Sequence, residues 1–561
     1  MTSDELLNGL PRSLRYPQVG MDSMLAGVAA SYGNRIALMD GDDHLTFREL
    51  QDNALRIATW LRRRGVDHGD RVAIAMPNNL RFAGVYLGTI LAGATACVVN
   101  PLTPTATLAE QFEDFDPIAL FIHPTSESAL EARTSRMELV VRVPGTHTSG
   151  RGAAGRPDSA VPLADLLAVQ PQPLPACHPD TVAHLQLTGG TTGNSKGVLI
   201  THRNILANMI QLAAHRSGAL AALDGNDTMR LELREGAQHR YSDIPGTGVA
   251  LHLAPVFHGA GLMGLLSYIF TGTTTVLLGR FQPESFVDAI ERHQVTKAGG
   301  VPAMFHALLD LPHLHTRDVS SVLTISFGAA PIDTTTLKQL YDVFSNARVC
   351  EGYGLSEATC HLTLQPVEPD RLSPIGSVGL PLPDTEIEIR DATGKPLPPC
   401  ATGEIWARGP QVASGYHNAP EKTAEQFVNG WLRTGDLGHF DEGGNLFIDG
   451  RAKEMLIYKG YNIYPNHLEE LLAMHPAVAQ CTVVGADRPG VGQIPFAFVV
   501  AAGGYEVGAA LTEELMQFVS ARVAPHQRIR EIRFVTTFPM SPVGKILKRE
   551  LVQHTAQPEN S

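Results

Sequence analysis

The sequence predicts an α/β fold: a large N-terminal domain with helices layered on sheets of parallel type and a β-rich subdomain, then a small α+β C-terminal domain. A helical pattern over residues 45–64, a buried strand over 71–76 and a turn at 77–79 give the alternation typical of parallel sheets. Short β-like runs separated by turn residues occupy residues 379–450, which predicts the β-rich subdomain.

The pattern changes after Arg451 to a compact unit with a helix at 465–474 and strands at 479–485 and 495–501. We therefore expect a domain boundary near Lys453, which divides the chain into residues 1–452 and 453–561.

Two other stretches carry little hydrophobic periodicity. Residues 143–178 are rich in Gly, Ala and Pro and are expected to form a long surface loop. Residues 213–246 are polar, are interrupted by Gly, and resemble an insertion.

The composition fits a globular protein of more than one domain, with 561 residues, 43% hydrophobic and 18% charged. There are 44 basic and 57 acidic residues and a net charge of −13, which argues against a nucleic-acid partner. A local basic site can still bind an anionic nucleotide.

The six cysteines are scattered and form no C-x-x-C pair, so neither a disulfide framework nor a zinc site is expected. The N-terminal residues are acidic and lack a signal-peptide pattern, and no apolar run is long enough to span a membrane. We expect a cytoplasmic protein.

The densest chemical signal lies between Leu187 and Gly197, where Gly, Thr, Ser and one Lys follow a strand-like run. Glycines let the backbone approach a ligand, and hydroxyl and N–H groups can donate to phosphate oxygens. Ser195 before Lys196 and Gly197 after it exclude a Walker A loop. The candidate nucleotide contacts in this loop are Thr188, Gly189, Gly190, Thr191, Thr192, Gly193 and Lys196.

A second Gly-rich loop, residues 351–359, places an aromatic, a hydroxyl and a carboxylate within five residues. An aromatic ring such as that of Tyr353 can stack on adenine, and the Ser356 hydroxyl can bind phosphate. The Glu357 carboxylate can hold Mg²⁺ that bridges phosphate oxygens. Further candidate nucleotide contacts are Gly354 in this loop and Gly328, Ala329 and Ala330 in an earlier turn.

Three positions later in the sequence are further candidate site residues. Asp436 lies between two glycines and is suited to accept hydrogen bonds from both ribose hydroxyls. Arg451 ends the β-rich region, and Lys545 lies on a loop after Pro542 and Gly544. The following Lys548 and Arg549 are interpreted as surface charges.

These motifs occur in one order over about residues 45–550 and resemble those of the adenylate-forming enzymes, which include acyl-CoA synthetases, peptide-synthetase adenylation domains and beetle luciferases. Two positions depart from the usual pattern: Ser195 replaces Pro, and Ser356 replaces the more frequent Thr.

The resemblance implies a role for each motif. Thr191, Thr192 and Lys196 would hold the β- and γ-phosphates of ATP, and Arg451 would make a second ribose contact. The resemblance also implies that residues 1–452 form the AMP-binding, acyl-adenylating domain and that residues 453–561 form a mobile lid domain. The residues it implies for catalysis and domain rotation are Lys545 in adenylation, Lys453 as hinge, and Lys459 and Gly460 in thioester formation.

His258 indicates the branch of the superfamily. Peptide-synthetase adenylation domains usually carry Asp there to pair with the substrate amine, whereas acyl- and aryl-CoA synthetases carry a histidine beside the substrate carboxylate. We therefore expect an AMP-forming acyl-CoA synthetase that uses ATP, Mg²⁺ and CoA. A ligase that loads a carrier protein, a luciferase-like oxygenase and a non-catalytic protein remain alternatives, and homodimer formation stays open.

The sequence does not name the acid. The segments that resemble pocket walls are small and apolar, with Gly259, Gly261, Gly264, Gly299 and Gly300 among them. This favours an uncharged fatty or aryl acid.

Overall fold

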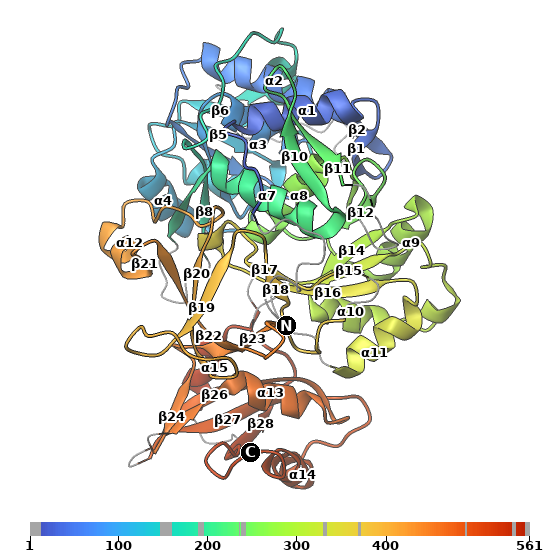
Figure 1. Ribbon diagram of the computed structural model, residues 1–561, viewed down its shortest axis with the longest axis vertical. Helices are drawn as coiled ribbons and strands as arrows, with labels where there is room; N and C mark the ends of the chain where they lie inside the picture. Colours follow the sequence, from blue (N-terminus) through green and yellow to red (C-terminus); the bar gives the residue numbers. More distant parts are fainter. Residues whose placement is uncertain are drawn as a thin grey trace.

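The computed structural model shows helices packed around four main sheets, with the C-terminal sheet and its helices at one end of the molecule (Figure 1). The residues that the structure describes are 13–145, 160–188, 196–234, 236, 243–328, 334–368, 372–459, 461–488, 491–540 and 546–555.

The first sheet has seven strands in the order β7-β6-β5-β3-β4-β8-β9. All its neighbours are parallel except β8 and β9, which run antiparallel. The phosphate-loop sequence lies between these two strands, so both its ends are fixed by one sheet. The strands are β3 (Arg71–Ala75), β4 (Thr95–Val99), β5 (Ala119–Ile122), β6 (Leu139–Arg142), β7 (Val161–Pro162), β8 (Val182–Leu187) and β9 (Gly197–Thr201).

The second sheet has nine strands in the order β18-β17-β16-β15-β14-β12-β13-β1-β2 and is antiparallel only at its two edges. Because β15 and β16 are parallel, the Gly328 turn and the 351–359 loop lie at the same edge. The strands are β1 (Ile36–Asp40), β2 (Asp43–Thr46), β12 (Val249–His252), β13 (Thr274–Leu277), β14 (Lys297–Gly300), β15 (Thr324–Phe327), β16 (Arg348–Tyr353), β17 (Thr363–Leu364) and β18 (Leu380–Pro381).

The predicted β-rich subdomain is confirmed as a five-stranded antiparallel sheet in which β22 pairs with β20, β21 and β23. Its register sets Asp436 opposite Arg451, so two predicted site residues are cross-strand neighbours. The strands are β19 (Glu386–Arg390), β20 (Gly403–Arg408), β21 (Phe427–Val428), β22 (Trp431–Phe440) and β23 (Leu446–Arg451).

The predicted C-terminal α+β unit forms a fourth sheet, β25-β24-β27-β26, with β28 paired to β27. It encloses its own core, in which buried Leu468 and Leu472 of α13 pack with Val483 and Val499 of the sheet. The elements are β24 (Leu456–Tyr458), β25 (Tyr461–Ile463), α13 (Pro465–Ala473), β26 (Val478–Arg488), β27 (Gly492–Ala501), α14 (Ala509–Ser520), β28 (Glu531–Phe534) and α15 (Lys548–His554).

The remaining helices cover the N-terminal sheets, and α2 occupies the helical stretch predicted for residues 45–64. None of the helices in the described part of the chain is long and apolar enough to cross a membrane. The helices are α1 (Met21–Tyr32), α2 (Phe47–Arg63), α3 (Phe82–Leu91), α4 (Thr105–Phe115), α5 (Glu127–Glu131), α6 (Leu163–Leu167), α7 (His202–Ser217), α8 (Gly259–Phe270), α9 (Pro283–His293), α10 (Pro302–Leu309), α11 (Thr334–Val343), α12 (Pro420–Gln426) and the 3₁₀ turns η1 (Pro124–Ser126), η2 (Leu314–Thr316) and η3 (Ser356–Ala358).

One sequence expectation needs correction, and the structure gives a second stretch a defined form. The expected loop at 143–178 contains β7 and helix α6, whose buried Leu163 and Leu166 anchor it to the core, and its residues 146–159 lie outside the described part. The insertion-like stretch at 213–246 begins with the last turn of α7 and continues as a hairpin, β10 (Ala219–Leu223) and β11 (Met229–Leu233).

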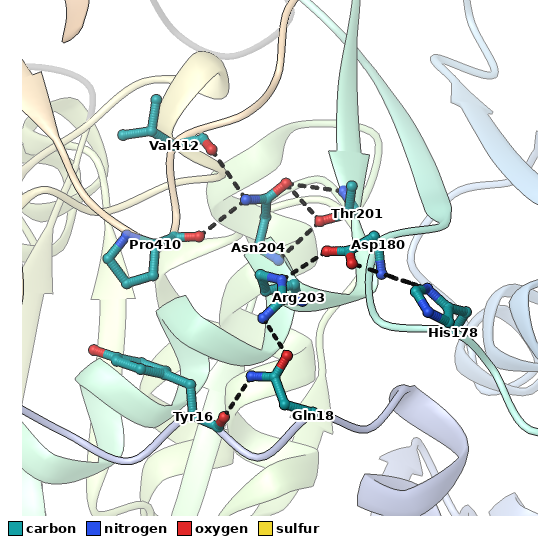
Figure 2. Close-up of polar contacts among 9 residues, drawn as sticks. All are labelled: Tyr16, Gln18, His178, Asp180, Thr201, Arg203, Asn204, Pro410 and Val412. Carbon is teal, nitrogen blue, oxygen red and sulfur yellow. Dashed lines mark hydrogen bonds and ion pairs between the residues drawn. The ribbon is translucent and has the colours of Figure 1, made fainter. Parts of the chain in front are cut away.

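The start of α7 joins the first sheet to the segment that precedes α12 (Figure 2). Thr201 and Asn204 form a capping box, and the Asn204 amide also donates to the carbonyls of Pro410 and Val412 at 2.9 and 3.0 Å. Arg203 pairs with Asp180 at 2.7 Å. These contacts fix the course of the 410–417 segment, which reaches the candidate site.

Candidate active site

Part of the predicted site lies outside the described residues. The positions concerned are Gly189, Gly190, Thr191, Thr192, Gly193, Ala329, Ala330, Gly460 and Lys545.

The two ends of the phosphate loop close on each other. The Thr188 N–H donates to the Lys196 carbonyl at 3.0 Å, and the Lys196 N–H donates to Thr188 Oγ1 at 3.4 Å. The Lys196 ammonium lies 4.9 Å from the centre of the Tyr416 ring. This cation–π contact directs the one lysine of the loop toward the 410–417 segment.

Tyr416 also binds Glu357, the predicted metal ligand. Its hydroxyl donates to Glu357 Oε1 at 2.7 Å. Burial, together with the nearby Glu357 carboxylate, raises the pKa of Tyr416 well above its ordinary value, so the phenol keeps its proton and remains a donor. One aromatic side chain thus links Lys196 and Glu357, which are 161 positions apart in the sequence.

The backbone around Tyr416 is held against the strand that follows the phosphate loop. The Leu199 N–H donates to the Gly415 carbonyl at 2.9 Å, and the His417 N–H donates to the Gly197 carbonyl at 2.8 Å. The sequence analysis missed Tyr416. The Ser-Gly-Tyr turn at 414–416 was its only local signal, and such turns are common.

A second cluster joins Tyr353, Asp436 and Arg451. The Tyr353 hydroxyl donates to Asp436 Oδ2 at 2.7 Å, and Arg451 Nε lies 3.0 Å from Asp436 Oδ1. Asp436 is only 5% exposed, whereas the Arg451 side chain is 48% exposed. Burial raises the pKa of Tyr353, and the Asp436 charge raises that of Arg451, so both partners remain donors toward the carboxylate.

The glycines at this edge have different structural roles. Gly328 is exposed, and a Cβ added there would have no atom within 4 Å, so a ligand could approach its backbone. At Gly354 an added Cβ would meet the Cys360 carbonyl oxygen at 1.5 Å. Glycine is therefore required at 354 by the fold itself. Ser356 begins the 3₁₀ turn η3, which carries Glu357.

His258 is the N-cap of α8, and its Nδ1 accepts from the Ala260 N–H at 3.4 Å. The adjoining Phe257 carbonyl accepts from Gln186 Nε2 at 3.1 Å. Gln186 precedes the phosphate loop by two residues, so it connects the His258 turn to that loop. The sequence analysis did not single out Gln186, because a lone polar residue in an apolar strand carries no specific signal.

The predicted hinge and thioester residues follow β23. Lys453 is exposed in a turn where the N–H groups of Glu454 and Met455 donate to the Arg451 carbonyl at 2.9 and 3.0 Å. Lys459 is exposed and has a left-handed backbone, with φ of 50°. Its N–H donates to the Val491 carbonyl at 2.8 Å.

Lys548 was interpreted from the sequence as a surface charge, and that interpretation is wrong. Its ammonium lies 2.9 Å from Glu469 and 3.2 Å from Glu454, and its side chain is only 21% exposed. Two nearby carboxylates compensate its burial. Arg549, interpreted in the same way, is exposed.

The residues present fit Mg²⁺ bound together with a nucleotide. Among the described residues no group of three or more His, Cys, Asp or Glu side chains could hold a metal ion. A site of one carboxylate, such as Glu357, completed by phosphate oxygens and water is the usual arrangement for Mg²⁺.

Comparison with known proteins agrees with this geometry. Residues 25–417 match the family model of the AMP-binding enzymes, and residues 467–545 match the AMP-binding enzyme C-terminal domain. The chain belongs to the AMP-binding enzyme family. The family makes it an ATP-dependent, adenylate-forming acid–thiol ligase.

Similar proteins span several acids. The chain is 31% identical to a long-chain-fatty-acid–CoA ligase of Bacillus subtilis (strain 168), over 99% of this chain and 98% of that one. It is 34% identical to a 4-coumarate–CoA ligase-like protein of Oryza sativa subsp. japonica, over 87% and 78%. A structure of O-succinylbenzoate CoA synthetase from Bacillus subtilis with ATP and magnesium has a TM-score of 0.76 and 26% identity, over 94% of this chain and 99% of that one.

Proposed function

We propose that this enzyme activates a fatty or aryl carboxylic acid with Mg-ATP to an acyl-adenylate and then transfers the acyl group to CoA. The observation that carries the proposal is the Tyr353–Asp436–Arg451 cluster, which unites three separate nucleotide motifs around one buried carboxylate. The similarity to fatty-acid and 4-coumarate CoA ligases supports the acid classes.

In the first step a substrate carboxylate attacks the α-phosphorus of ATP, which forms the acyl-adenylate and releases pyrophosphate. Asp436 accepts hydrogen bonds from the ribose hydroxyls, and Arg451, beside Asp436, makes a second contact with the ribose. Lys196 and the phosphate-loop residues Thr191 and Thr192 bind the β- and γ-phosphates. Glu357 would hold Mg²⁺, which would neutralise part of the phosphate charge when bound. Lys545 stabilises the charge that develops on the α-phosphate and the attacking carboxylate.

In the second step the CoA thiol attacks the acyl carbonyl, the thioester forms and AMP leaves. Residues 453–561 rotate about Lys453 between the steps, so that Lys545 withdraws and the Lys459-Gly460 face approaches. Glycine at 460 leaves room for the pantetheine arm. The exposure of Lys453 supports this hinge, because its side chain is not packed into a core.

His258 flanks the substrate carboxylate in this proposal, and its position at the start of α8 supports that role because the helix N-terminus favours an anion. A cytoplasmic location remains part of the proposal, and the absence of a disulfide among the six cysteines, all in the described residues, accords with a reducing compartment.

The test is a screen of carboxylic acids for ATP-dependent pyrophosphate release, followed by measurement of free CoA consumption. The proposal expects both activities with the same acid. Pyrophosphate release without CoA consumption would instead favour loading of a carrier protein. No release with any acid would refute acid activation altogether.

A further inference from the structure

A stripe of partly exposed residues runs along one face of α8, starting next to His258. Ala260, Gly264 and Tyr268 are spaced four apart and therefore lie above one another on the helix. Ala260 is exposed, and Gly264 and Tyr268 are half-buried, whereas most of their sequence neighbours on α8 are fully buried. Solvent thus reaches this face of an otherwise buried helix.

Two glycines, Gly264 on this face of α8 and Gly299 on β14, have no side chain to fill the space around them. A Cβ at Gly264 would meet only His252 at 3.8 Å, and a Cβ at Gly299 would meet Ser326 at 3.5 Å or more. Gly299 and Ser326 are register partners on β14 and β15, and both are half-buried. At both glycines an added Cβ would make only ordinary van der Waals contacts, so neighbouring atoms do not crowd these positions.

Charged groups gather at the far end of the stripe. Lys297 forms a buried ion pair with Asp243 at 3.1 Å, and its ammonium lies 5.7 Å from the centre of the Tyr268 ring. Arg216, at the end of α7, hydrogen-bonds to Ser326 Oγ at 3.4 Å. Within the described part of the chain Arg216 has no ion-pair partner.

The insertion-like stretch builds this cluster. The Asp243 N–H donates to the Arg216 carbonyl at 3.1 Å, so the chain leaves α7 at Arg216 and returns at Asp243 after the β10–β11 hairpin. Among the described residues the cluster holds two cations, Lys297 and Arg216, and one anion, Asp243. Burial lowers the pKa of Lys297, and Asp243 opposes that effect. Arg216 is half-buried, and a partly desolvated guanidinium favours the approach of an anion.

We infer that the acid this enzyme activates carries a second anionic group at its far end, which Arg216 binds with Lys297 beside it. From Ala260 to Tyr268 α8 rises about 12 Å. A carbon chain with bonds of about 1.5 Å covers this in roughly nine or ten carbons. The expected substrate class is therefore an α,ω-dicarboxylic acid of that length. This inference rests on the proposed function and replaces the uncharged chain that the apolar segments favour.

The chemistry of the far end also explains how a monocarboxylic acid would be rejected. A methyl end placed against Arg216 would remove water from the guanidinium and give no hydrogen bond in return. A carboxylate would accept two charge-assisted hydrogen bonds from the same group.

The test compares decanedioic with decanoic acid, and the same pairs from six to fourteen carbons, by pyrophosphate release. The expected kcat/KM is at least tenfold higher for the diacid near ten carbons. Arg216→Gln is expected to lower kcat/KM for the diacid at least tenfold, mainly through KM, and to leave the monoacid unchanged or improved. No carboxylate among the described residues pairs with Arg216, so this variant is expected to fold. Arg230→Gln, on the outer hairpin and paired with Glu232, is the matched control and should match wild type.

Equal or better use of the monoacid at every length would overturn the inference, while the proposed function would stand. An equal loss for both acids in Arg216→Gln would also overturn it, because the cluster would then be structural. If no acid supported pyrophosphate release, the proposed function and the inference would both be overturned.

Discussion

Glu351 offers a pH-dependent test of the contact between the two predicted domains. It lies on β16, is 7% exposed, and faces Glu470 of α13 in the C-terminal unit. Burial, with a further contribution from the Glu470 charge, raises the pKa of Glu351 from 4.5 to about 7. Burial also raises the pKa of Glu470, and Asp449 and Glu469 add to that rise.

The sign follows from proton binding. Between pH 4.5 and about 7 the folded protein keeps a proton on Glu351 that the unfolded chain releases. The free energy of unfolding therefore falls as the pH rises through this window and is constant, for this group, above it. The shift from 4.5 to about 7 corresponds to about 3 kcal/mol.

Glu351→Gln removes this titration while keeping the shape of the side chain. The variant should gain stability over wild type as the pH rises from 5 to 8, by most of about 3 kcal/mol, which amounts to several degrees in melting temperature. Differential scanning calorimetry at each pH measures the difference. The exposed Glu442→Gln variant is the control and should follow wild type. Parallel curves for Glu351→Gln and wild type would refute the reasoning.

Three further predictions concern the site and the hinge. Tyr416→Phe keeps the ring beside Lys196 but removes the hydroxyl that donates to Glu357. The KM for Mg-ATP should rise about threefold to tenfold, because roughly 1 kcal/mol of hydrogen bonding is lost, and the melting temperature should not change. An unaltered Mg²⁺ dependence of pyrophosphate release would argue against that contact. Lys548→Met leaves the carboxylates of Glu454 and Glu469 without their cation, so calorimetry should show the C-terminal unit destabilised by roughly 2 kcal/mol and adenylation should slow. Arg549→Met, at the exposed neighbouring position, should change neither stability nor adenylation. Lys453→Pro fixes φ near −65° and should leave one half-reaction near normal and depress the other in single-turnover assays; near-wild-type rates for both would place the hinge elsewhere.

Local periodicity predicted much of the fold. The alternation at 45–76 anticipated α2 and β3, and the patterns at 465–501 anticipated α13, β26 and β27 within a few residues. The hairpin within residues 213–246 was not predicted. Its first strand consists of Ala and Leu, which favour a helix, and the apolar–polar alternation of its second strand is a strand signal that was missed.

Motif reasoning selected candidate site residues that lie within single loops and missed the residues that connect separate loops. Asp436 and Tyr353 stand out in Gly-rich sequence, and the structure joins them. Tyr416 and Gln186 bring separate motifs together through tertiary contacts, which sequence spacing does not encode. Lys548 looked like a solvated charge because its two carboxylate partners lie about 80 and 94 positions earlier.

The central claim is that one site forms an acyl-adenylate and then a thioester. The most direct measurement is a single-turnover reaction with an acid found active in the screen, quenched and assayed for acyl-adenylate, acyl-CoA and AMP. The account predicts that acyl-adenylate forms with pyrophosphate before CoA is added, and that CoA then converts it to acyl-CoA with one AMP released for each thioester. The account would be contradicted if acyl-adenylate persisted in the presence of CoA, or if acyl-CoA formed without prior formation of acyl-adenylate.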